Sequence, residues 1–498
     1  MIISNQTLNQ IKAGNVSIPD GSLFQLNEKV LQFGTGVLLR GLPDYFIDKA
    51  NRQKSFNGRV VVVKSTRKGD VSEFEAQNGL YTICVRGLEH GKPVEENIIS
   101  SAISRVLSAD KDWPAILELA TQSTLQVIIS NTTEVGIQLV QENIGLNPPV
   151  SFPAKVLAVL YERYKALGDT NKADIVIIAT ELIPDNGKKL EAIVHELAVF
   201  NTLEAEFKEW LKIHAFFCNS LVDRIVPGKP DDAATLKLEQ ELGYKDNLLI
   251  MAEPYRLWAI EGNERVSALL DLESADQGVI VKPDIEIYRE LKVRLLNGSH
   301  TLTCGIAYLS GVETVNAAMR NEELRNYVTD VMHKEIIPGI PYQVETDVAV
   351  AFAKSVTDRF GNPYIEHLWI NIAFQYTMKM KIRILPVLNQ YYKIYNKAPG
   401  HIAFGFAAFL LFMRIAKKEG DKYFGIHNGR EYLITDDQAA YFYTKRELQG
   451  PDYVNEILAD GALWGSDLSS LNGFIETVER NYSYISENGI TKALSLVN

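Results

Sequence analysis

The sequence has few cysteines, no excess of basic over acidic residues and no long hydrophobic run. Its three cysteines are far apart and form no CxxC pair, so nothing suggests a disulfide framework or a structural zinc site. A formal net charge of -11 at pH 7 argues against nucleic acid or an anionic membrane as a partner. The N-terminal residues contain no apolar segment like a signal peptide, and we therefore expect a cytoplasmic protein.

Membrane-spanning segments are not expected either. The longest uncharged apolar run, Ile402 to Met413, is well short of the roughly 20 residues of a membrane helix, and we predict a buried helix there. At roughly 100 to 200 residues per domain, a chain of 498 residues is long enough for two or three domains.

The first half contains an alternation of short strands and amphipathic helices. The segments expected as buried parallel strands are continuous and β-branched, and they cover residues 29–33, 59–63, 125–130 and 174–179. Amphipathic stretches such as residues 152–167 lie between them. This order is typical of a Rossmann-type, doubly wound α/β domain.

From about residue 280 the sequence keeps a helical apolar period, and strand-like runs become scarce. We therefore predict a Rossmann-type dinucleotide-binding domain over residues 1–280. A mainly α-helical C-terminal domain, with the substrate and catalytic residues, is predicted over residues 281–498.

A glycine loop follows the first predicted strand, in the segment FGTGVLLRG. Gly34 and Gly36 occupy the first two positions of the dinucleotide fingerprint, where glycine permits a tight turn and lets backbone N–H groups approach a pyrophosphate. Leu39 stands at the third position, and Gly41 comes two residues later. The place of the loop between a strand and a helix favours nucleotide binding over a plain strand-ending turn.

Polar residues also follow the other predicted strands, where an open α/β sheet binds its ligands. The second strand runs into KSTR, residues 64–67, where chains that bind NAD commonly have an acid. By itself this favours NADP, or a solvated turn. Further clusters lie at residues 130–136, 180–187 and 219–228; the second could equally be a plain turn and the third a helix end.

The segment LKVRLLNGSH places Lys292, Asn297 and His300 in an otherwise apolar stretch. At the α-helical period, Asn297 lies roughly 140° and His300 roughly 80° from Lys292, so all three can line one edge of a cleft, with Gly298 letting a ligand come close. Each residue alone could be a surface lysine or a buried core residue.

This set suits alcohol oxidation and carbonyl reduction. A lysine with a lowered pKa can exchange the hydroxyl proton as hydride moves, and an asparagine amide can bind the oxygen on which charge develops.

Together these motifs resemble the mannitol dehydrogenase family, the polyol-specific long-chain dehydrogenases. The spacing Lys292-x4-Asn297-x2-His300 is similar to the family signature, and FGTGVLLRG with Arg40 is similar to its GxGxxxR start. The similarity continues through SNTTEVGI, SFPAKVLAVLYERY, TELIPDNG, NSLVDRIVPG and ELGYKD to TMKMKIRILP, over most of residues 29–390.

The resemblance implies a two-domain fold with the active site in the cleft between the domains. It further implies metal-independent hydride transfer between NADH and D-tagaturonate, giving D-altronate, with NADP not excluded as the cofactor. Lys292 is then the general acid/base, Asn186 and Asn297 form the oxyanion hole, and His300 binds a substrate oxygen. The implied cofactor-binding residues are Phe33, Gly34, Thr35, Gly36, Val37, Arg40, Lys64, Ser65, Asn131, Thr133, Glu134 and Asp223.

Two further residues are candidates for substrate binding. Lys379 aligns with the substrate-side lysine of the family, whereas Asn371 stands where mannitol-type members have an arginine. The run KMKIRI, which begins at Lys379, offers the positive charge that the carboxylate of an anionic sugar acid needs in an acidic protein. For Lys381 and Arg383 the favoured interpretation is a solvated face.

Other functions remain open. Fructuronate reductase and mannitol 2-dehydrogenase are close alternatives within the family. A nucleotide-binding sensor without catalysis belongs to a different class, and the lysine, asparagine and histidine set argues against it. A Schiff-base enzyme that uses Lys292 on a keto sugar is a third possibility. The sequence leaves the oligomeric state undetermined.

Overall fold

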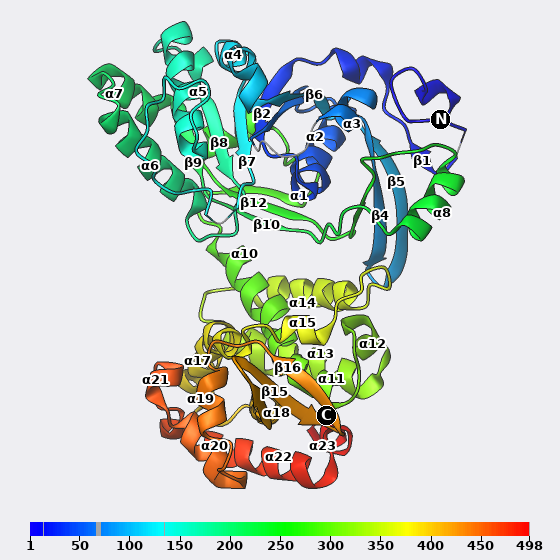
Figure 1. The fold of residues 1–498 in the computed structure, drawn as a ribbon, viewed down its shortest axis with the longest axis vertical. Helices are drawn as coiled ribbons and strands as arrows, with labels where there is room; N and C mark the ends of the chain where they lie inside the picture. Colours follow the sequence, from blue (N-terminus) through cyan, green and yellow to red (C-terminus); the bar gives the residue numbers. More distant parts are fainter. Residues whose placement is uncertain (13, 66–70, 134, 498) are drawn as a thin grey trace. The chain divides into compact units, whose positions relative to one another are not determined.

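The computed structural model describes residues 1–12, 14–65, 71–133 and 135–497 (Figure 1). The chain separates into two compact units. Unit 1 comprises Met1–Arg86 and Pro93–Ile285, and unit 2 comprises Gly87–Lys92 and Glu286–Asn498. The predicted boundary at 280/281 lies a few residues before this change, and the assignment of the short segment Gly87–Lys92 to unit 2 has no counterpart in the prediction.

A parallel sheet forms the centre of unit 1. Its six strands in the described residues are, in spatial order, β6 (Ile103–Ser108), β3 (Arg59–Lys64), β2 (Glu28–Phe33), β7 (Val127–Ser130), β8 (Ile175–Ala179) and β9 (Ala215–Cys218). This is the strand order of a Rossmann fold. All strands are parallel, and the sequence order along the sheet reverses between β2 and β7, which is the switch point of the sheet. The four predicted strands are confirmed, and they occupy the four central places of the sheet.

Helices cover both faces of this sheet because consecutive side chains of a strand point to opposite faces. Leu31 and Val61 pack in one core with α5 (Phe152–Leu167), α6 (Asn186–Phe200) and α7 (Ala205–His214). Val30 and Val62 pack in another core with α2 (Pro43–Arg52). Figure 1 shows α5, α6 and α7 together beside β7, β8 and β9, with α1 and α2 on the other side of the sheet.

Among its described residues, unit 1 also contains two smaller sheets. One contains β1 (Val16–Ser17), β5 (Lys92–Ser100), β4 (Tyr81–Glu89) and β11 (Ile250–Ala252), and the other contains β10 (Ser220–Asp223), β12 (Leu257–Glu261) and β13 (Val279–Lys282). The remaining α-helices in the described residues of unit 1 are α1 (Val37–Gly41), α3 (Ser72–Ala76), α4 (Ala109–Ala120), α8 (Asp232–Leu242) and α9 (Glu264–Leu270).

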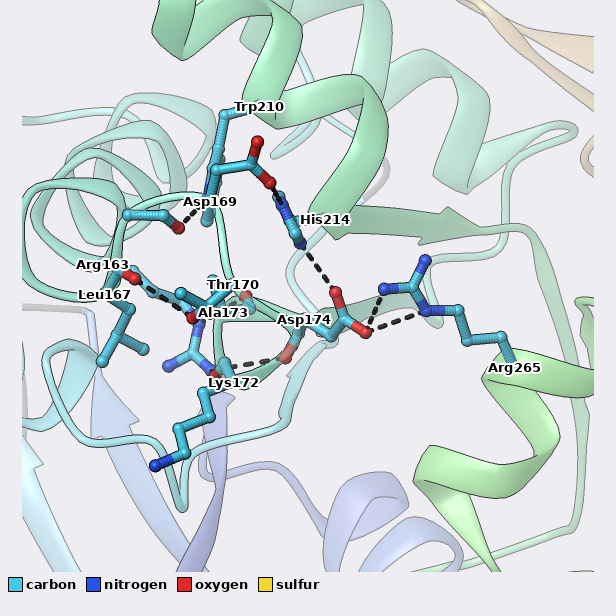
Figure 2. A network of polar contacts seen from close by, with 11 residues as sticks. Arg163, Leu167, Asp169, Thr170, Lys172, Ala173, Asp174, Trp210, His214 and Arg265 are labelled. Atoms are coloured by element: carbon cyan, nitrogen blue, oxygen red, sulfur yellow. Dashed lines mark hydrogen bonds and ion pairs between the residues drawn. The ribbon is translucent and has the colours of Figure 1, made fainter.

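A polar network lies at the amino end of β8 (Figure 2). The fully buried Arg163 of α5 donates to backbone carbonyls that include Ala173 O (2.9 Å) and Ala120 O (3.2 Å). Asp174, which precedes β8, accepts from His214 Nδ1 at 2.8 Å and also pairs with Arg265 of α9. Because parallel sheets bind ligands at the carboxyl ends of their strands, this network at the opposite end stabilises the fold.

Unit 2 is mainly helical, as predicted. At its centre α18 (Gly400–Phe412) packs against α11 (Ser299–Leu309) and α22 (Phe474–Asn488) and is buried on nearly all sides, which explains why its sequence is apolar throughout. The other α-helices are α10 (Glu286–Leu291), α12 (Val315–Arg320), α13 (Glu322–Asp330), α14 (Thr346–Phe360), α15 (Trp369–Ile372), α16 (Tyr376–Lys379), α17 (Leu385–Tyr395), α19 (Ala439–Thr444), α20 (Gly450–Leu458), α21 (Gly461–Trp464) and α23 (Ile490–Val497).

In the described residues of unit 2, three segments form π-helix with i→i+5 hydrogen bonding, and they interrupt or extend α-helices. They are η4 (Lys292–Gly298), η5 (Val331–Ile336) and η7 (Met380–Ile384). A small antiparallel sheet of β14 (Lys417–Glu419), β15 (Lys422–His427) and β16 (Arg430–Ile434) follows α18.

Candidate functional site

The glycine loop connects β2 to α1 at the carboxyl edge of the parallel sheet. Gly34 has φ +133°, and a Cβ there would lie 2.9 Å from Leu39 Cδ1 and 3.1 Å from Asn131 O, so both the backbone and its neighbours require glycine. Gly36 has φ -64° and nothing within 4 Å of an added Cβ. The fold therefore gives no reason for glycine at position 36, whereas an open backbone that a ligand approaches does.

Other members of the predicted cofactor set lie around this loop, but several side chains face the interior of unit 1. Phe33 is fully buried and packs edge-on against Phe152, with ring centroids 5.3 Å apart. Arg40 is buried, and its Nη1 donates to Leu248 O at 2.5 Å. Its guanidinium also lies 5.4 Å from the centre of the Tyr81 ring, so that this arginine holds α1 to the interior. A direct contact of Arg40 with a cofactor stays a prediction.

The neighbouring strand ends carry the remaining cofactor candidates. Lys64 ends β3, and the buried Oγ of Ser65 has no hydrogen-bond partner in the described residues. Asn131, after β7, donates to Thr180 O at 3.1 Å and to Thr180 Oγ1 at 3.0 Å. Thr133 is exposed.

The remaining predicted cofactor positions differ in where they lie. Asp223 ends β10 and therefore belongs to a separate sheet. Glu134, like Thr66 and Arg67, falls outside the described residues. Thr35 and Val37 are half-buried parts of the loop and of the first turn of α1.

Glu181 is a residue of this edge that the sequence-based prediction missed. It is buried after β8, and its carboxylate accepts from Ser130 Oγ (3.1 Å), Thr132 N (2.8 Å) and Thr132 Oγ1 (2.9 Å). It thus joins the ends of β7 and β8 beside the switch point. The signal was present in the sequence, because an acid lies two residues after the fourth predicted strand.

Asn186, at the start of α6, is buried and makes four hydrogen bonds. Its Nδ2 donates to Glu181 O and to Ser220 O, each at 3.0 Å. Its Oδ1 accepts from Gly187 N at 2.9 Å and from Ser220 N at 3.0 Å. The side chain thus fastens the loop after β8 to β10, and its role as a donor to substrate stays a prediction.

In unit 2, Lys292 and Asn297 lie at the two ends of one π turn. The prediction assumed α-helical geometry for residues 291–300, and this is wrong for η4, because here the backbone bonds run from i to i+5. Residues five apart stack on the same side of a π-helix, whereas an α-helix separates them by roughly 140°. The wider turn therefore brings the two side chains closer to one face than the sequence indicated.

Gly298 differs from its predicted role. It is buried, and an added Cβ would lie 3.5 Å from Ile384 Cδ1 of η7. The glycine thus faces a neighbouring helical segment, whereas the prediction placed a ligand beside it.

His300, in the first turn of α11, is buried against aromatic rings. Its imidazole stacks on Phe360 with ring centroids 3.8 Å apart, and its buried Nε2 has no hydrogen-bond partner in the described residues. Burial, together with the nearby His367 and Arg383, lowers the pKa of His300 well below its usual value. The ring therefore stays neutral at physiological pH and can exchange a hydrogen bond with a ligand oxygen.

Basic side chains surround His300. Lys379 donates to Ile372 O at 2.8 Å, and burial, followed by repulsion from Arg383, lowers its pKa. Arg383 donates to Thr301 Oγ1 at 3.1 Å and to Asn297 O at 3.4 Å, whereas Lys381 turns to Leu463 O at 2.9 Å. The solvated face expected for Arg383 is therefore wrong, and this residue belongs to the cluster.

The other substrate candidate, Asn371, is exposed on α15. Elsewhere, the described residues contain no group of three or more His, Cys, Asp or Glu side chains placed to hold a metal ion. None of the helices in the described part of the chain combines the length and apolar character that crossing a bilayer requires.

Comparison with known sequences gives matches over nearly the whole chain. Residues 28–274 match the mannitol dehydrogenase Rossmann domain, and residues 284–486 match the mannitol dehydrogenase C-terminal domain. A protein named altronate oxidoreductase from Halalkalibacterium halodurans is 38% identical over 484 residues, which cover 95% of this chain and 93% of the relative. An altronate oxidoreductase from Bacillus subtilis is 34% identical and covers 94% and 95%, respectively.

Solved structures share the fold. The ternary complex of Pseudomonas fluorescens mannitol 2-dehydrogenase with NAD and D-mannitol matches with a TM-score of 0.68 at 21% identity, over 100% of this chain and 99% of that one. A substrate-free D-sorbitol dehydrogenase matches with a TM-score of 0.82 at 21% identity, over 99% and 100%. On the evidence of both domains and of the relatives that cover them, the chain belongs to the mannitol dehydrogenase family.

Proposed function

We propose that this protein is an NAD-dependent reductase that converts the keto sugar acid D-tagaturonate to D-altronate without a metal. The observation that supports the chemistry is the π turn that runs from Lys292 past Asn297, followed in the chain by the buried His300, whose Nε2 has no hydrogen-bond partner in the described residues. The substrate is supported by the two relatives named altronate oxidoreductase, which cover almost the full chain.

The glycine loop of unit 1 fits a dinucleotide. Because Gly36 has no side chain, the space beside its backbone is free for a ligand. The residue follows the central strand β2 and lies beside the switch point of the sheet. Bound NADH supplies the hydride. The residues at the ends of β2, β3 and β7 hold and orient it in this proposal, and NADP remains the alternative.

The groups of unit 2 handle the proton and the developing charge. As hydride reaches the carbonyl carbon, the oxygen gains negative charge, which the amide N–H of Asn297 binds. The ammonium of Lys292 gives its proton to this oxygen, so D-tagaturonate, NADH and one proton yield D-altronate and NAD⁺. The neutral His300 binds a substrate oxygen through Nε2 and fixes the orientation of the sugar. In oxidation Lys292 takes the proton back.

Asn186 is the second proposed donor to the reacting oxygen. Because both of its amide hydrogens are bound to Glu181 O and Ser220 O, it joins the oxyanion hole only if substrate replaces one of these carbonyls. An Asn186→Asp variant separates the two roles. A change in turnover with unchanged stability supports contact with substrate, and a loss of stability with normal turnover supports a fastening role alone.

The proposal is tested by the initial rates of NADH oxidation with D-tagaturonate, D-fructuronate and D-fructose, each repeated with NADPH. We expect D-tagaturonate and NADH to give the highest kcat/KM. Equal rates on D-fructose, or no turnover of either uronate, contradict the proposal. A preference for D-fructuronate indicates a fructuronate reductase instead. A cytoplasmic location stays a prediction from the sequence.

A further inference from the structure

In the part of the chain that the structure describes, Arg383 is a half-buried cation without an acidic partner. Its Nη1 donates to Thr301 Oγ1 and to Asn297 O, and its Nε and Nη2 have no partner among the described residues. Burial lowers the pKa of its guanidinium to about 10, with no carboxylate opposing this effect. Taking a charge out of water without a counter-charge is unfavourable, so an anion is expected to complete this site.

A second arginine of the same region shows how the fold pairs such a charge when only structure is required. Arg294 of η4 is buried, and its Nε and Nη2 each lie 2.9 Å from the carboxylate oxygens of Glu290. This is the two-pronged geometry that a guanidinium prefers with a carboxylate. The corresponding edge of the Arg383 guanidinium is free of partners in the described residues, since only Nη1 is hydrogen-bonded. Lys381, two residues earlier, instead donates to Leu463 O.

The charges near Arg383 have the same sign. His300 experiences positive potential from Arg383, Arg359 and Lys379, and Lys379 in turn experiences that of Arg383. Asp436 is the acid that acts on Lys379, and it does not offset Arg383. In a chain with a net charge of -11, this local excess of positive charge fits a small anion.

We propose that Arg383 binds the carboxylate of the sugar-acid substrate through its Nε and Nη2 edge and so selects hexuronate-derived substrates against neutral ketoses. This inference rests on the proposed function and adds the residue that decides the substrate class. Thr301 and the carbonyl of Asn297 hold Nη1, so the guanidinium is oriented before substrate arrives. Its anchor on Asn297 couples the carboxylate end of the substrate to the residue that binds the reacting oxygen.

The test compares D-tagaturonate with D-tagatose, the neutral ketose in which CH₂OH replaces the carboxylate. In Arg383→Met, we expect kcat/KM for D-tagaturonate to fall roughly 30-fold or more, mainly through KM, which is about 2 kcal/mol at 1.4 kcal/mol per tenfold. The value for D-tagatose changes little, and Arg383→Lys recovers part of the loss. Lys381→Met is the matched control and leaves both substrates unaffected.

A binding measurement keeps the inference testable without turnover. With NAD⁺ present, D-altronate is expected to raise the melting temperature of the wild type and of Arg383→Lys more than that of Arg383→Met, while the neutral polyol D-altritol raises all three equally. Equal losses on D-tagaturonate and D-tagatose, or equal stabilisation by D-altronate in every variant, overturn the role of Arg383. A wild type that turns over D-tagatose but not D-tagaturonate overturns the proposed function instead.

Discussion

Gly36 offers a test that separates cofactor binding from folding. Its φ of -64° and ψ of 155° are accessible to alanine, and an added Cβ meets no heavy atom within 4 Å. The substitution Gly36→Ala is therefore expected to change the free energy of unfolding by less than about 1 kcal/mol, since alanine also restricts the unfolded chain. If Gly36 had no role beyond the fold, the substitution would therefore leave the activity of the protein unchanged.

Binding of the nucleotide is expected to respond very differently. If backbone N–H groups at Gly36 contact the pyrophosphate, a methyl group pushes the phosphate oxygens outward and lengthens hydrogen bonds that require about 2.9 Å. Losing one such bond to a charged group costs about 1.5–3 kcal/mol, which corresponds to roughly a 10- to 150-fold higher Kd for NADH.

Two further glycines calibrate this result. Gly21 also has nothing within 4 Å of an added Cβ but lies in a surface 3-10 helix, so Gly21→Ala should leave stability and NADH binding unchanged. Gly34→Ala places a Cβ against Leu39 and Asn131 at a φ of +133° and should lower both. Kd is measured by NADH fluorescence titration and stability by thermal denaturation without cofactor. Wild-type NADH affinity in Gly36→Ala would refute the assignment of this loop to the pyrophosphate.

Three other predictions concern separate parts of the chain. Lys292→Ala should lower kcat by roughly 100- to 10,000-fold while NADH still binds, and normal turnover in single-turnover and steady-state assays would remove Lys292 from acid/base catalysis. His300 is held neutral by its lowered pKa, so below its ordinary pKa the unfolded chain binds a proton that the folded one does not. The free energy of unfolding should thus decrease as the pH falls below about 6.5, by up to about 1.4 kcal/mol per pH unit. Denaturation of His300→Asn at several pH values should show a smaller decrease, and a pH dependence equal to that of the wild type would contradict this role of His300. Arg163→Met leaves several buried carbonyls at the amino end of β8 without donors. It should lower the free energy of unfolding, measured by urea denaturation, by at least about 3 kcal/mol while KM is unchanged. A raised KM would contradict a purely structural role of Arg163.

Much of unit 1 could be predicted because its signals are local. The strands around Leu31, Val61, Ile128 and Ile177 are buried on both faces, so each is a short, continuous β-branched run that can be identified without knowing its neighbours. Gly34 and Gly36 could likewise be assigned to a nucleotide loop, because a strand followed by GxG and a helix is a local pattern.

The candidate site in unit 2 could be predicted only in part from such local signals. The identities and spacing of Lys292, Asn297 and His300 are written in the sequence, but the π geometry that aligns the first two depends on how η4 packs in the helical core. The four bonds of Asn186 and the inward turn of Arg40 depend on partners up to about two hundred residues away, such as Leu248, which no local pattern contains.

The sequence by itself determined the order of strands and helices, the glycine loop, the change to a helical second half and the residue types available for proton transfer, because each depends on neighbours within one or two turns. The tertiary structure alone decided which of these residues share a site. Lys381 and Arg383 have the same charge and are two residues apart. Lys381 donates to Leu463 O, whereas Arg383 lies against Asn297 and Thr301 with part of its guanidinium unpaired within the described chain. That difference is a matter of which distant backbone each side chain meets, and only the folded chain supplies it.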